Sequence, residues 1–421
     1  MIQTTNQHHE VNHRTTCRHC GHPLSLSMVD LGAQPPCEAI LTEEQFYEPE
    51  PFYPLHARVC ENCWLVQLDA DVSPEKIYTE YAYYSSYSES WLQHMESYTD
   101  SICTRLGLTP NHRVVEIASN DGYLLQFFAD RGIPCFGIDP AANVAEKALE
   151  RGIETLVSFF STDTAEQIVK ERGKADLIIA NNVFGHIPDI NDFLQALQQL
   201  LQEGGTITIE IPHLMRLIEG NQFDTIYHEH YCYHSLIADL KLLESQGLKL
   251  IAVEELPTHG GSIRMFIAHR EDARAPDDSI ERLVGIERSR GMDTPAPYQA
   301  FGEKVRQTKR NLLRFLIAAK EEGKQVVGYG APGKGNTLLN YCGIREDFLD
   351  FVVDRNPYKH GKFLPGSRIP IRPVEAVFEA KPDFLLILPW NISDEIIRQM
   401  DGVRAWGCQF VIPIPEVRIV V

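Results

Sequence analysis

Between residues 113 and 210 the chain alternates short runs of consecutive apolar residues with longer segments in which apolar residues recur every three or four positions. The short runs are typical of buried strands, and the longer segments are typical of helices that pack by one face. We expect strands at 113–118, 135–139, 175–180 and 205–210, and helices at 91–106, from 123, at 143–150 and at 190–201. Strands that alternate with helices predict βαβ units and a doubly wound, parallel α/β sheet.

The same alternation returns near the C-terminus. A long helix is expected there because apolar or small residues recur along one face, at Phe301, Val305, Thr308, Leu312, Phe315 and Ala319. Strands are expected next, at 325–329, 351–354, 384–388 and, more weakly, 410–412. These elements predict a second α/β unit at 298–421, and the polar, Pro-containing segment 273–297 is predicted to link it to the first unit at 86–272.

The first 85 residues are different in character. They are rich in Cys, Pro and aromatic residues and lack a long helical period, which predicts a small, loop-rich module. Residues 1–15 contain no apolar run of the length that a signal peptide needs, and we expect them to be a disordered lead-in. The length of 421 residues agrees with such a division into two or three domains.

Composition and charge limit the kinds of molecule that the chain is expected to bind. The chain is 43% hydrophobic and 23% charged, as soluble globular proteins are, and no apolar stretch approaches the ~20 residues that cross a bilayer. The formal net charge of −19 opposes contact with nucleic acid and with anionic membranes. We therefore expect a cytoplasmic protein that binds neither, in which cysteine spacing carries more information than cysteine number.

Four cysteines form two pairs with metal-ligand spacing. Cys17 and Cys20 are one CxxC pair, and Cys60 and Cys63 are the other. Four thiolates are the number that a tetrahedral structural zinc requires, and a closed site of this kind holds together a module with a small core. Such a site has no vacancy for a substrate, so we expect no catalytic role. Four unrelated thiols or a redox disulfide pair are the alternatives.

The first predicted strand ends in a small-residue turn. Glu116 lies in the strand, residues 118–122 (Ala-Ser-Asn-Asp-Gly) follow, and Asp139 ends the next strand. A doubly wound sheet presents backbone to a nucleotide at such a turn, and the second acid is placed to hold ribose hydroxyls. This segment resembles class I S-adenosylmethionine-dependent methyltransferases, although their usual glycine-rich loop is replaced. Residues expected to hold that cofactor are Glu116, Ala118, Ser119, Asn120, Gly122, Tyr123, Asp139 and Asn181.

Two further segments carry candidate chemistry. Tyr227-His-Glu-His230 follows a predicted strand, and its two histidines and one acid can chelate a metal, act as an acid/base centre, or simply form a polar loop. His186 follows another strand and opens onto the same edge of the sheet. Gly328-x-Gly330-x-x-Gly333 follows a strand and precedes a helix, as in NAD-binding domains, with Asp354 at the end of the next strand. The same loop can receive the diphosphate of a nucleotide sugar, or can be a turn without a ligand.

Taken together, the motifs resemble one family over nearly the whole chain: the zinc-containing C-methyltransferases that methylate carbon 3 of nucleotide-linked 4-keto deoxysugars. The resemblance is carried by the two CxxC pairs and by segments 81–88, 116–123, 181–188, 227–230, 259–264 and 328–339. It implies an N-terminal zinc-binding module, a central class I methyltransferase Rossmann-like domain and a C-terminal Rossmann-like α/β domain. It also implies S-adenosylmethionine as cofactor, a structural Zn²⁺, and a monomer or weak homo-oligomer.

The resemblance assigns roles to residues as well. His230 would be the general base that converts carbon 3 into an enolate, and Tyr227, Glu229, His186 and either Tyr81 or Tyr83 would line the same site. Glu229 or a tyrosine would orient the imidazole, and His186 or a tyrosine would donate a hydrogen bond to the developing oxyanion. The nucleotide, which can be dTDP, GDP or CDP, would be held by Gly330, Pro332, Gly333, Lys334, Asn336, Arg355 and Lys359. The alternatives are an NAD-dependent oxidoreductase that uses the C-terminal glycine loop, and a non-catalytic zinc-ribbon adaptor.

Overall fold

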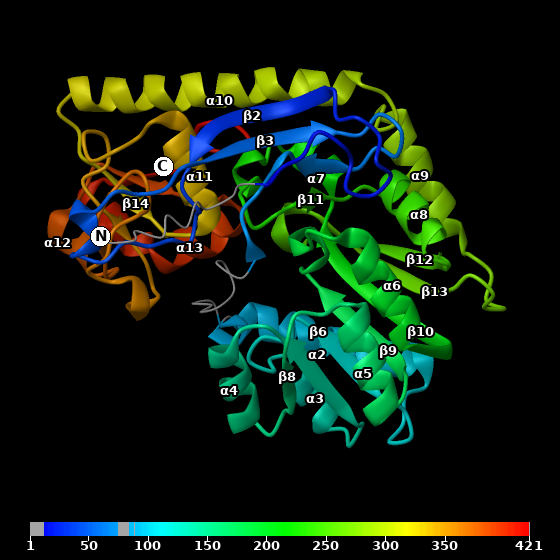
Figure 1. Ribbon diagram of the computed structural model, residues 1–421. Coiled ribbons are helices and arrows are strands. Elements are labelled where there is room, and N and C mark those ends of the chain that lie inside the picture. Colours follow the sequence, from blue (N-terminus) through cyan, green and yellow to red (C-terminus); the bar gives the residue numbers. More distant parts are fainter. Residues whose placement is uncertain (1–11, 75–83, 88, 421) are drawn as a thin grey trace, which may run out of the picture.

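A seven-stranded sheet forms the central part of the chain. The computed structural model describes residues 12–74, 84–87 and 89–420 (Figure 1). The sheet has the order β12-β13-β10-β9-β6-β7-β8. Its strands are β6 (Val114–Ile117), β7 (Cys135–Asp139), β8 (Thr155–Val157), β9 (Ala175–Asn181), β10 (Leu201–Pro212), β12 (Leu248–Leu256) and β13 (Ser262–His269). The four strands that the apolar runs predicted are confirmed as β6, β7, β9 and β10.

The direction of these strands decides where chemistry can occur. Strands β8, β7, β6, β9 and β10 pair in parallel, and β13 is antiparallel to both β10 and β12. It follows that β12 runs in the same direction as β10. The carboxyl ends of β6, β7, β9, β10 and β12 therefore meet at one edge of the sheet, which we call the reaction edge.

Helices cover both faces of this sheet, as predicted. They are α2 (Glu89–Leu106), α3 (Leu125–Ala129), α4 (Ala142–Glu150), α5 (Thr162–Arg172) and α6 (Ile190–Leu200). Helix α6 buries Phe193, Leu194 and Leu197, and the side chain of Asp189 caps its N-terminus. On the other face, Met95 and Ile102 of α2 pack with Phe128 of α3 in a separate apolar cluster.

The N-terminal module is an antiparallel sheet whose edge strand comes from elsewhere in the chain. Strands β2 (Leu26–Gln34), β3 (Tyr53–Val59) and β4 (Val66–Leu68) are joined by β11 (Cys232–Tyr233) in the order β11-β4-β3-β2. Residues 12–13, part of the lead-in, form β1 (Asn12–His13), which pairs with β5 (Ala70–Asp71). The module therefore shares a sheet with the segment that directly follows the Tyr-His-Glu-His motif.

The C-terminal part is a second α/β unit with the order β16-β15-β14-β17-β18-β19. All its strands are parallel except β19, which is antiparallel to β18. The strands are β14 (Val326–Tyr329), β15 (Val352–Val353), β16 (Ile371–Arg372), β17 (Phe384–Ile387), β18 (Gln409–Ile412) and β19 (Arg418–Val420), and the helices are α11 (Gly333–Cys342), α12 (Ala376–Ala380) and α13 (Ser393–Gln399). This is the Rossmann-like arrangement that the sequence predicted.

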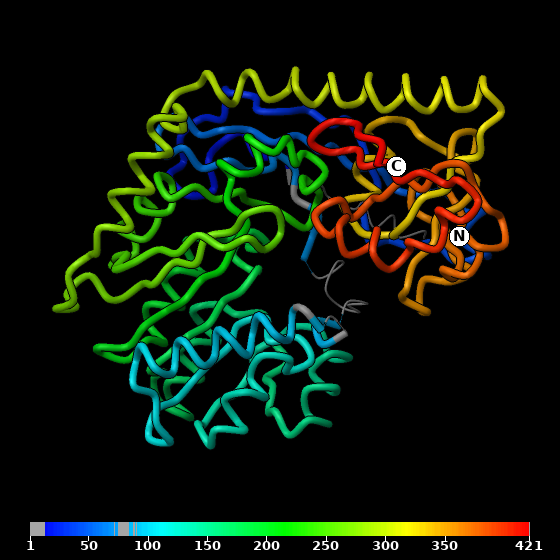
Figure 2. The backbone as a smooth tube through the Cα atoms, turned by 180° about the vertical axis from the view of Figure 1, so that it is seen from behind, coloured from blue at the N-terminus to red at the C-terminus, as the bar shows by residue number. Residues whose placement is uncertain are grey.

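One long helix connects the parts. Helix α10 (Ala296–Glu321) runs along the N-terminal sheet to the C-terminal unit, as both ribbon views show (Figures 1 and 2). The predicted apolar face is present: Phe301, Val305 and Leu312 are fully buried. Within the predicted linker 273–297 lies helix α9 (Asp278–Ser289), which buries Leu283 and Val284. None of the helices in the described part of the chain is long and apolar enough to cross a bilayer.

Helix α9 also supplies a buried carboxylate. Glu287 accepts hydrogen bonds from Nε2 of His213 at 2.7 Å and from the backbone N–H groups of Leu236 and Ile237 at 2.7 and 2.8 Å. The two N–H groups belong to the first turn of α8 (Leu236–Ser245), so Glu287 caps that helix. Since Glu287 and His213 are almost completely buried, neither side chain has water as an alternative partner.

We expect Glu287→Ala to lower the free energy of unfolding by about 3 kcal/mol or more, because it leaves a buried histidine and two N–H groups without an acceptor. Thermal unfolding of the purified variant measures the loss. Glu281→Ala, at an exposed position of the same helix, is the matched control and should stay within about 0.5 kcal/mol of the wild type. Equal stability of the two variants would contradict this role for Glu287.

Candidate active site

The four cysteines of the two CxxC pairs come together. Their sulfur atoms all lie within 4.8 Å of one another, which confirms the predicted metal-binding cluster of Cys17, Cys20, Cys60 and Cys63. The two pairs sit on equivalent turns: Gly21 N–H donates to the Cys17 carbonyl at 2.9 Å, and Trp64 N–H donates to the Cys60 carbonyl at 2.8 Å. Both Gly21 and Trp64 have positive φ, of 70° and 67°.

Polar neighbours make this cluster suitable for a cation. The amide of Gln67 donates to the sulfur of Cys17 at 3.2 Å, and the amide of Asn62 donates to the sulfur of Cys20 at 3.5 Å. Hydrogen bonds among the sulfurs lower the pKa of Cys17 and raise the pKa values of Cys60 and Cys63, so without a cation the cluster favours one thiolate held by neighbouring thiols. Four sulfur donors with N–H···S support fit a closed tetrahedral site of the zinc type.

At the reaction edge, the loop after β6 folds back tightly. Ala118 and Asn120 have positive φ of 57° and 49°, and Gly122 has 74°. The loop is held against β7, because the Asn120 N–H donates to one carboxylate oxygen of Asp139 at 2.9 Å. Asp139 is buried, and burial raises its pKa to about 6. A β-carbon on Gly137 would collide with Ser119 at 2.0 Å, so glycine is required where the loop packs on β7.

The residues at this loop leave polar atoms for a ligand. The hydroxyl of Ser119 and the side-chain oxygen of Asn181 are buried and have no hydrogen-bond partner among the described residues. Glu116 is buried in β6, where burial and the charge of Asp139 raise its pKa. These groups fit the cofactor that the sequence predicted, since a nucleoside with an amino-acid tail offers hydroxyl and ammonium donors.

Residues 84–87 lie over the same loop. The Ser85 N–H donates to the side chain of Asn120 at 3.0 Å, and the Ser86 hydroxyl donates to Asp121 at 2.5 Å. Tyr81 and Tyr83, the predicted site tyrosines, lie outside the described residues.

Two predicted histidines and a tyrosine lie together next to the reaction edge. The rings of His230 and His186 are 4.6 Å apart and perpendicular, and the rings of Tyr227 and His230 are 4.0 Å apart. Nδ1 of His230 lies 2.8 Å from the carbonyl oxygen of Thr225. Because a carbonyl only accepts, Nδ1 carries the proton and Nε2 is left with a free lone pair.

These histidines are neutral at pH 7. Burial lowers the pKa of His186 to about 4, and burial, with smaller contributions from the neighbouring His186 and the charge of Lys334, lowers the pKa of His230 well below the usual range. Both side chains nevertheless keep part of their surface accessible. Burial is the main cause of the low pKa of His230, and among the described residues no hydrogen bond or ion pair joins a carboxylate to its ring.

Glu229, which was predicted as one of two ways to orient this imidazole, points elsewhere. Its carboxyl group is 3.6 Å from the thiol of Cys37 in the N-terminal module. Burial, with the charge of Glu38, raises the pKa of Glu229 to about 8, so the side chain is largely protonated at neutral pH. The orienting contact to His230 is instead the Thr225 carbonyl, which no side-chain motif could have revealed.

The C-terminal unit reaches this region through α11. Lys334 lies at the start of that helix, donates to the Asn391 side chain at 2.9 Å and lies 5.1 Å from the Trp390 ring. The Trp390 N–H donates to Asp224 at 2.7 Å, and Asp224 lies in the turn η4 (Phe223–Thr225) just before the histidine motif. Burial raises the pKa of Asp224 to about 6. Neither Asp224 nor Trp390 was predicted from the sequence.

The other residues predicted to bind nucleotide are spread around the same loop. The Asn336 amide donates to the Cys37 carbonyl at 2.5 Å, and Lys359 pairs with Glu38 at 3.2 Å. A β-carbon on Gly333 would contact Cys37, and one on Gly330 would contact Pro389. The N-terminal module therefore packs directly onto the glycine loop that runs from Gly330 through Pro332 to Gly333.

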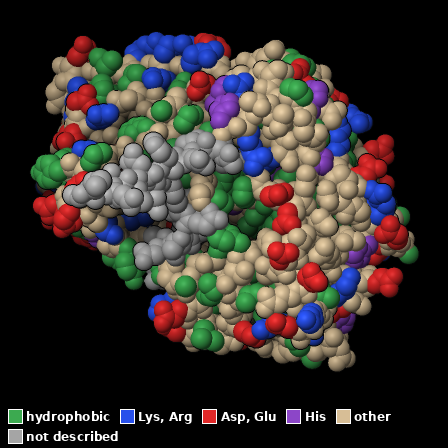
Figure 3. Space-filling model, viewed as in Figure 1, with side chains coloured by type: hydrophobic (Ala, Val, Ile, Leu, Met, Phe, Trp, Pro, Cys, Tyr) green, Lys and Arg blue, Asp and Glu red, His purple; other side chains and the backbone are tan. Residues whose placement is uncertain are grey.

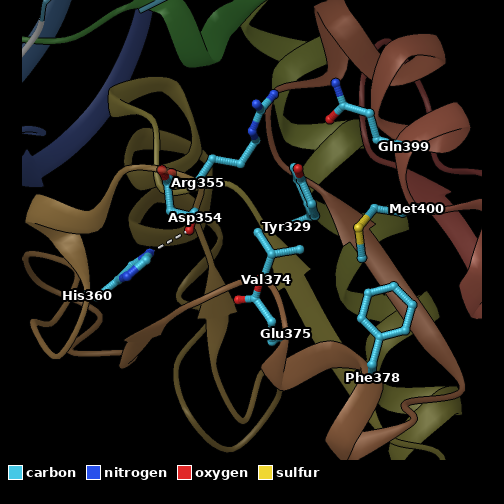
Figure 4. Close-up of a pocket in the computed structure, with 9 residues that line it drawn as sticks. All are labelled: Tyr329, Asp354, Arg355, His360, Val374, Glu375, Phe378, Gln399 and Met400. Atoms are coloured by element: carbon cyan, nitrogen blue, oxygen red, sulfur yellow. Dashed lines mark hydrogen bonds between the residues drawn. The ribbon is translucent and has the colours of Figure 1, made fainter.

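Beside this loop is a cavity of about 520 Å³. Tyr329 and Asp354, at the ends of β14 and β15, form one wall together with Arg355, the one predicted nucleotide ligand that lines it; the other lining residues are His360, Val374, Glu375, Phe378, Gln399 and Met400. In Figure 4, Phe378 lies next to Met400, and the polar ends of Arg355 and Gln399 stand at the upper rim. Asp354 accepts the N–H of Ala331 at 2.7 Å, which ties the cavity wall to the glycine loop.

Comparisons with known proteins identify the family. Three family models match in order along the chain: "Putative zinc binding domain" at 17–78, "Methyltransferase domain" at 91–253 and "C-methyltransferase C-terminal domain" at 257–415. C-methyltransferase NovU from Streptomyces niveus is 38% identical over 407 residues, which is 96% of each chain. This chain belongs to the C-methyltransferase family. It is an S-adenosylmethionine-dependent methyltransferase, and these matches support no oxidoreductase.

Other similarities to this C-methyltransferase are shorter. A ubiquinone biosynthesis O-methyltransferase from Chelativorans sp. is 29% identical over 98 residues, 23% of this chain and 39% of that one. Among solved structures, the PH0226 protein of Pyrococcus horikoshii OT3 is 13% identical, covers 46% of this chain and 97% of its own, and gives a TM-score of 0.36.

Metal removal should unfold the N-terminal module, because the metal–sulfur bonds contribute to its folding free energy and the clustered thiolates repel one another without a cation. We expect about one metal ion per chain by elemental analysis, and loss of soluble protein in Cys60→Ser. Cys103→Ser, at a cysteine outside the cluster, is the control and should leave the metal content unchanged. A metal-free preparation that is stable and folded would contradict a metal centre.

Proposed function

We propose that this C-methyltransferase methylates carbon 3 of a nucleotide-linked 4-keto deoxysugar, and that the cluster's metal is a structural Zn²⁺. The observation that carries the proposal is the placement of the His230, His186 and Tyr227 rings. They lie beside the reaction edge that bears the predicted methyl-donor loop, and the charge of Lys334 on the C-terminal unit contributes to the lowered pKa of His230. An acid/base group that faces both nucleotide-binding units is what a carbon nucleophile requires.

The carbon must lose a proton before it can be methylated. In the proposed reaction Nε2 of His230 takes the proton from carbon 3, and the C–H electron pair forms the C3–C4 double bond while the carbonyl becomes an enolate oxygen. The Thr225 carbonyl holds the ring and stabilises the imidazolium that results. S-adenosylmethionine, when bound at the β6 loop, supplies a methyl group on positive sulfur, which carbon 3 accepts as the C–S bond breaks.

The substrate's nucleotide fits the cavity of the C-terminal unit. Apolar side chains of Val374, Phe378 and Met400 suit the faces of a base, and Asp354 stands at the strand end where an acid commonly holds ribose. Arg355 at the rim and Lys359 near the glycine loop offset the diphosphate charge. Lys334 lies on the side of this loop that faces the histidines, so the sugar would extend toward His230.

We expect His230→Asn to reduce methyl transfer by about 10²–10⁴-fold, because asparagine cannot accept the proton. Methyl transfer to a panel of 4-keto nucleotide sugars, followed by mass spectrometry, measures the effect. Binding of S-adenosylhomocysteine should remain unchanged. In the wild type, kcat/KM, which reports the free enzyme, should not fall as the pH is lowered from 7 to 6, because burial lowers the pKa of His230 before substrate binds.

His228→Asn is the matched control, since that ring faces backbone carbonyls of the N-terminal module and not the site. Turnover of His230→Asn within a few fold of His228→Asn would reject His230 as the base. If the wild type transferred methyl groups to none of the 4-keto sugars, the substrate class itself would be wrong.

We expect Val374→Trp to weaken the binding of nucleoside 5′-diphosphates by tenfold or more, because the indole would fill the cavity. Titration calorimetry with the diphosphates of thymidine, guanosine and cytidine, each alone, gives the affinities. Tyr358→Ala, at an exposed aromatic residue of the same unit outside the cavity, should not change them. Unchanged affinity in Val374→Trp would place the nucleotide elsewhere.

A further inference from the structure

His259 occupies a position that the proposed chemistry does not yet use. It lies in the turn η5 (Thr258–Gly260) between β12 and β13. Because β12 runs parallel to β10, this turn stands at the reaction edge, level with the β6 loop and with the loop that carries the histidine motif. The topology thus brings a third histidine to the edge where the other two already lie.

The backbone of His259 is left-handed. Its φ and ψ are 54° and 23°, in a region that is uncommon for residues other than glycine, although asparagine, aspartate and histidine adopt it more often than the rest. The turn is fixed from both ends: the Gln222 amide donates to the Gly260 carbonyl at 2.8 Å, and the His213 N–H donates to the Gly261 carbonyl at 3.0 Å. Left-handed residues of this kind cluster at functional sites.

A buried ionic group supports the turn from below. The Thr258 hydroxyl donates to Glu210 at 3.0 Å, and Glu210 also pairs with Arg264 and with Nε2 of His94. Glu210 is fully buried at the end of β10. The turn is thereby anchored to the sheet through a buried carboxylate that Arg264 and His94 also hold, which restricts the movement of His259.

The ring of His259 has neighbours on both the methyl-donor side and the histidine side of the reaction edge. It lies 5.2 Å from the ring of Trp91, which in turn stacks at 6.5 Å on Tyr123 of the predicted methyl-donor loop. Its Nε2 is buried and has no hydrogen-bond partner among the described residues. Burial, with the charge of Lys334, lowers the pKa of His259 to about 4, and the ring is near enough to His230 to affect that residue's pKa.

A neutral imidazole always has one N–H to donate. When His230 removes the proton from carbon 3, negative charge develops on the neighbouring carbonyl oxygen, and a preorganised donor at that oxygen lowers the barrier. The histidine that supplies it should be neutral, unpaired and rigid, and His259 meets all three conditions. Lys334 is already held by Asn391 and Trp390, which leaves the nearby imidazole as a donor that a substrate can recruit.

We propose that an imidazole N–H of His259 donates a hydrogen bond to the substrate's C4 oxygen and stabilises the enolate that His230 generates. No bond to His259 forms or breaks, and its proton stays on the ring throughout. This role rests on the proposed function, and it makes His259 a catalytic residue for enolisation rather than for methyl transfer.

Exchange of the carbon 3 proton with deuterium, measured by mass spectrometry without any methyl donor, isolates the step. The test uses the holoprotein and a nucleoside-diphosphate 4-keto-6-deoxysugar made by a sugar dehydratase. His259→Gly is the main variant, because glycine accepts the left-handed backbone and removes only the ring. We expect it to keep the melting temperature and the affinity for S-adenosylhomocysteine, but to exchange about 10²–10³-fold more slowly.

His259→Asn should recover part of the rate, since asparagine tolerates the same backbone and has an N–H donor. His269→Ala, at the far end of β13, is the control and should exchange as the wild type does. Exchange by His259→Gly within threefold of wild type, or a loss that tracks the melting temperature, would overturn the role of His259 alone. A wild type that exchanges no proton from the substrate would overturn the proposed function and this role with it.

Discussion

The segment that carries His230 is bonded to all three parts of the molecule, and the geometry of the site depends on these contacts. It leaves the central sheet at the end of β10 and returns to the N-terminal sheet as β11, where the Leu68 N–H donates to the Tyr231 carbonyl at 3.0 Å. Between these points Asp224 is bonded to Trp390, and Phe223 packs edge-on against Tyr341 of α11. A shift of any one part would therefore move His230.

This arrangement explains how the metal cluster can affect the position of the histidine loop. The second CxxC turn, at Cys60 and Cys63, leads within three residues into β4, and β4 is the strand that pairs with β11. Trp64, in the same turn, stacks on Tyr298 of α10. The metal cluster thus holds β4 in place, and β4 pairs with β11, the strand that follows the histidine loop. The cluster itself has no open position for a substrate.

Patterns confined to one strand or helix were readable from the sequence. The run at 135–139 is β7 to the residue, and the apolar face of α10 is where the periodicity placed it. Strand β11 was not predictable, because two residues are too few to show a periodic pattern. Helix α9 was missed because the polar face that it exposes makes its sequence look like a linker. Motif spacing likewise predicted correctly that the cysteines lie together and that the histidines lie together. The contacts of Glu229 with Cys37 and of Asp224 with Trp390 could not be predicted in this way, because they join residues more than 160 positions apart.

The ionisable side chains of the site are shifted toward their neutral forms because burial disfavours the charged form. The lowered pKa values of His186, His230 and His259 and the raised pKa of Glu229 all move the group toward its neutral form at pH 7. A neutral cluster is a weak base, but the diphosphate of the proposed substrate would carry negative charge toward the same low-dielectric region and favour the imidazolium. In the proposed reaction, substrate binding would then raise the basicity of His230 when the carbon 3 proton is within reach. In a chain with a net charge of −19, neutral imidazoles in place of carboxylates would also avoid repelling the anion of the proposed substrate.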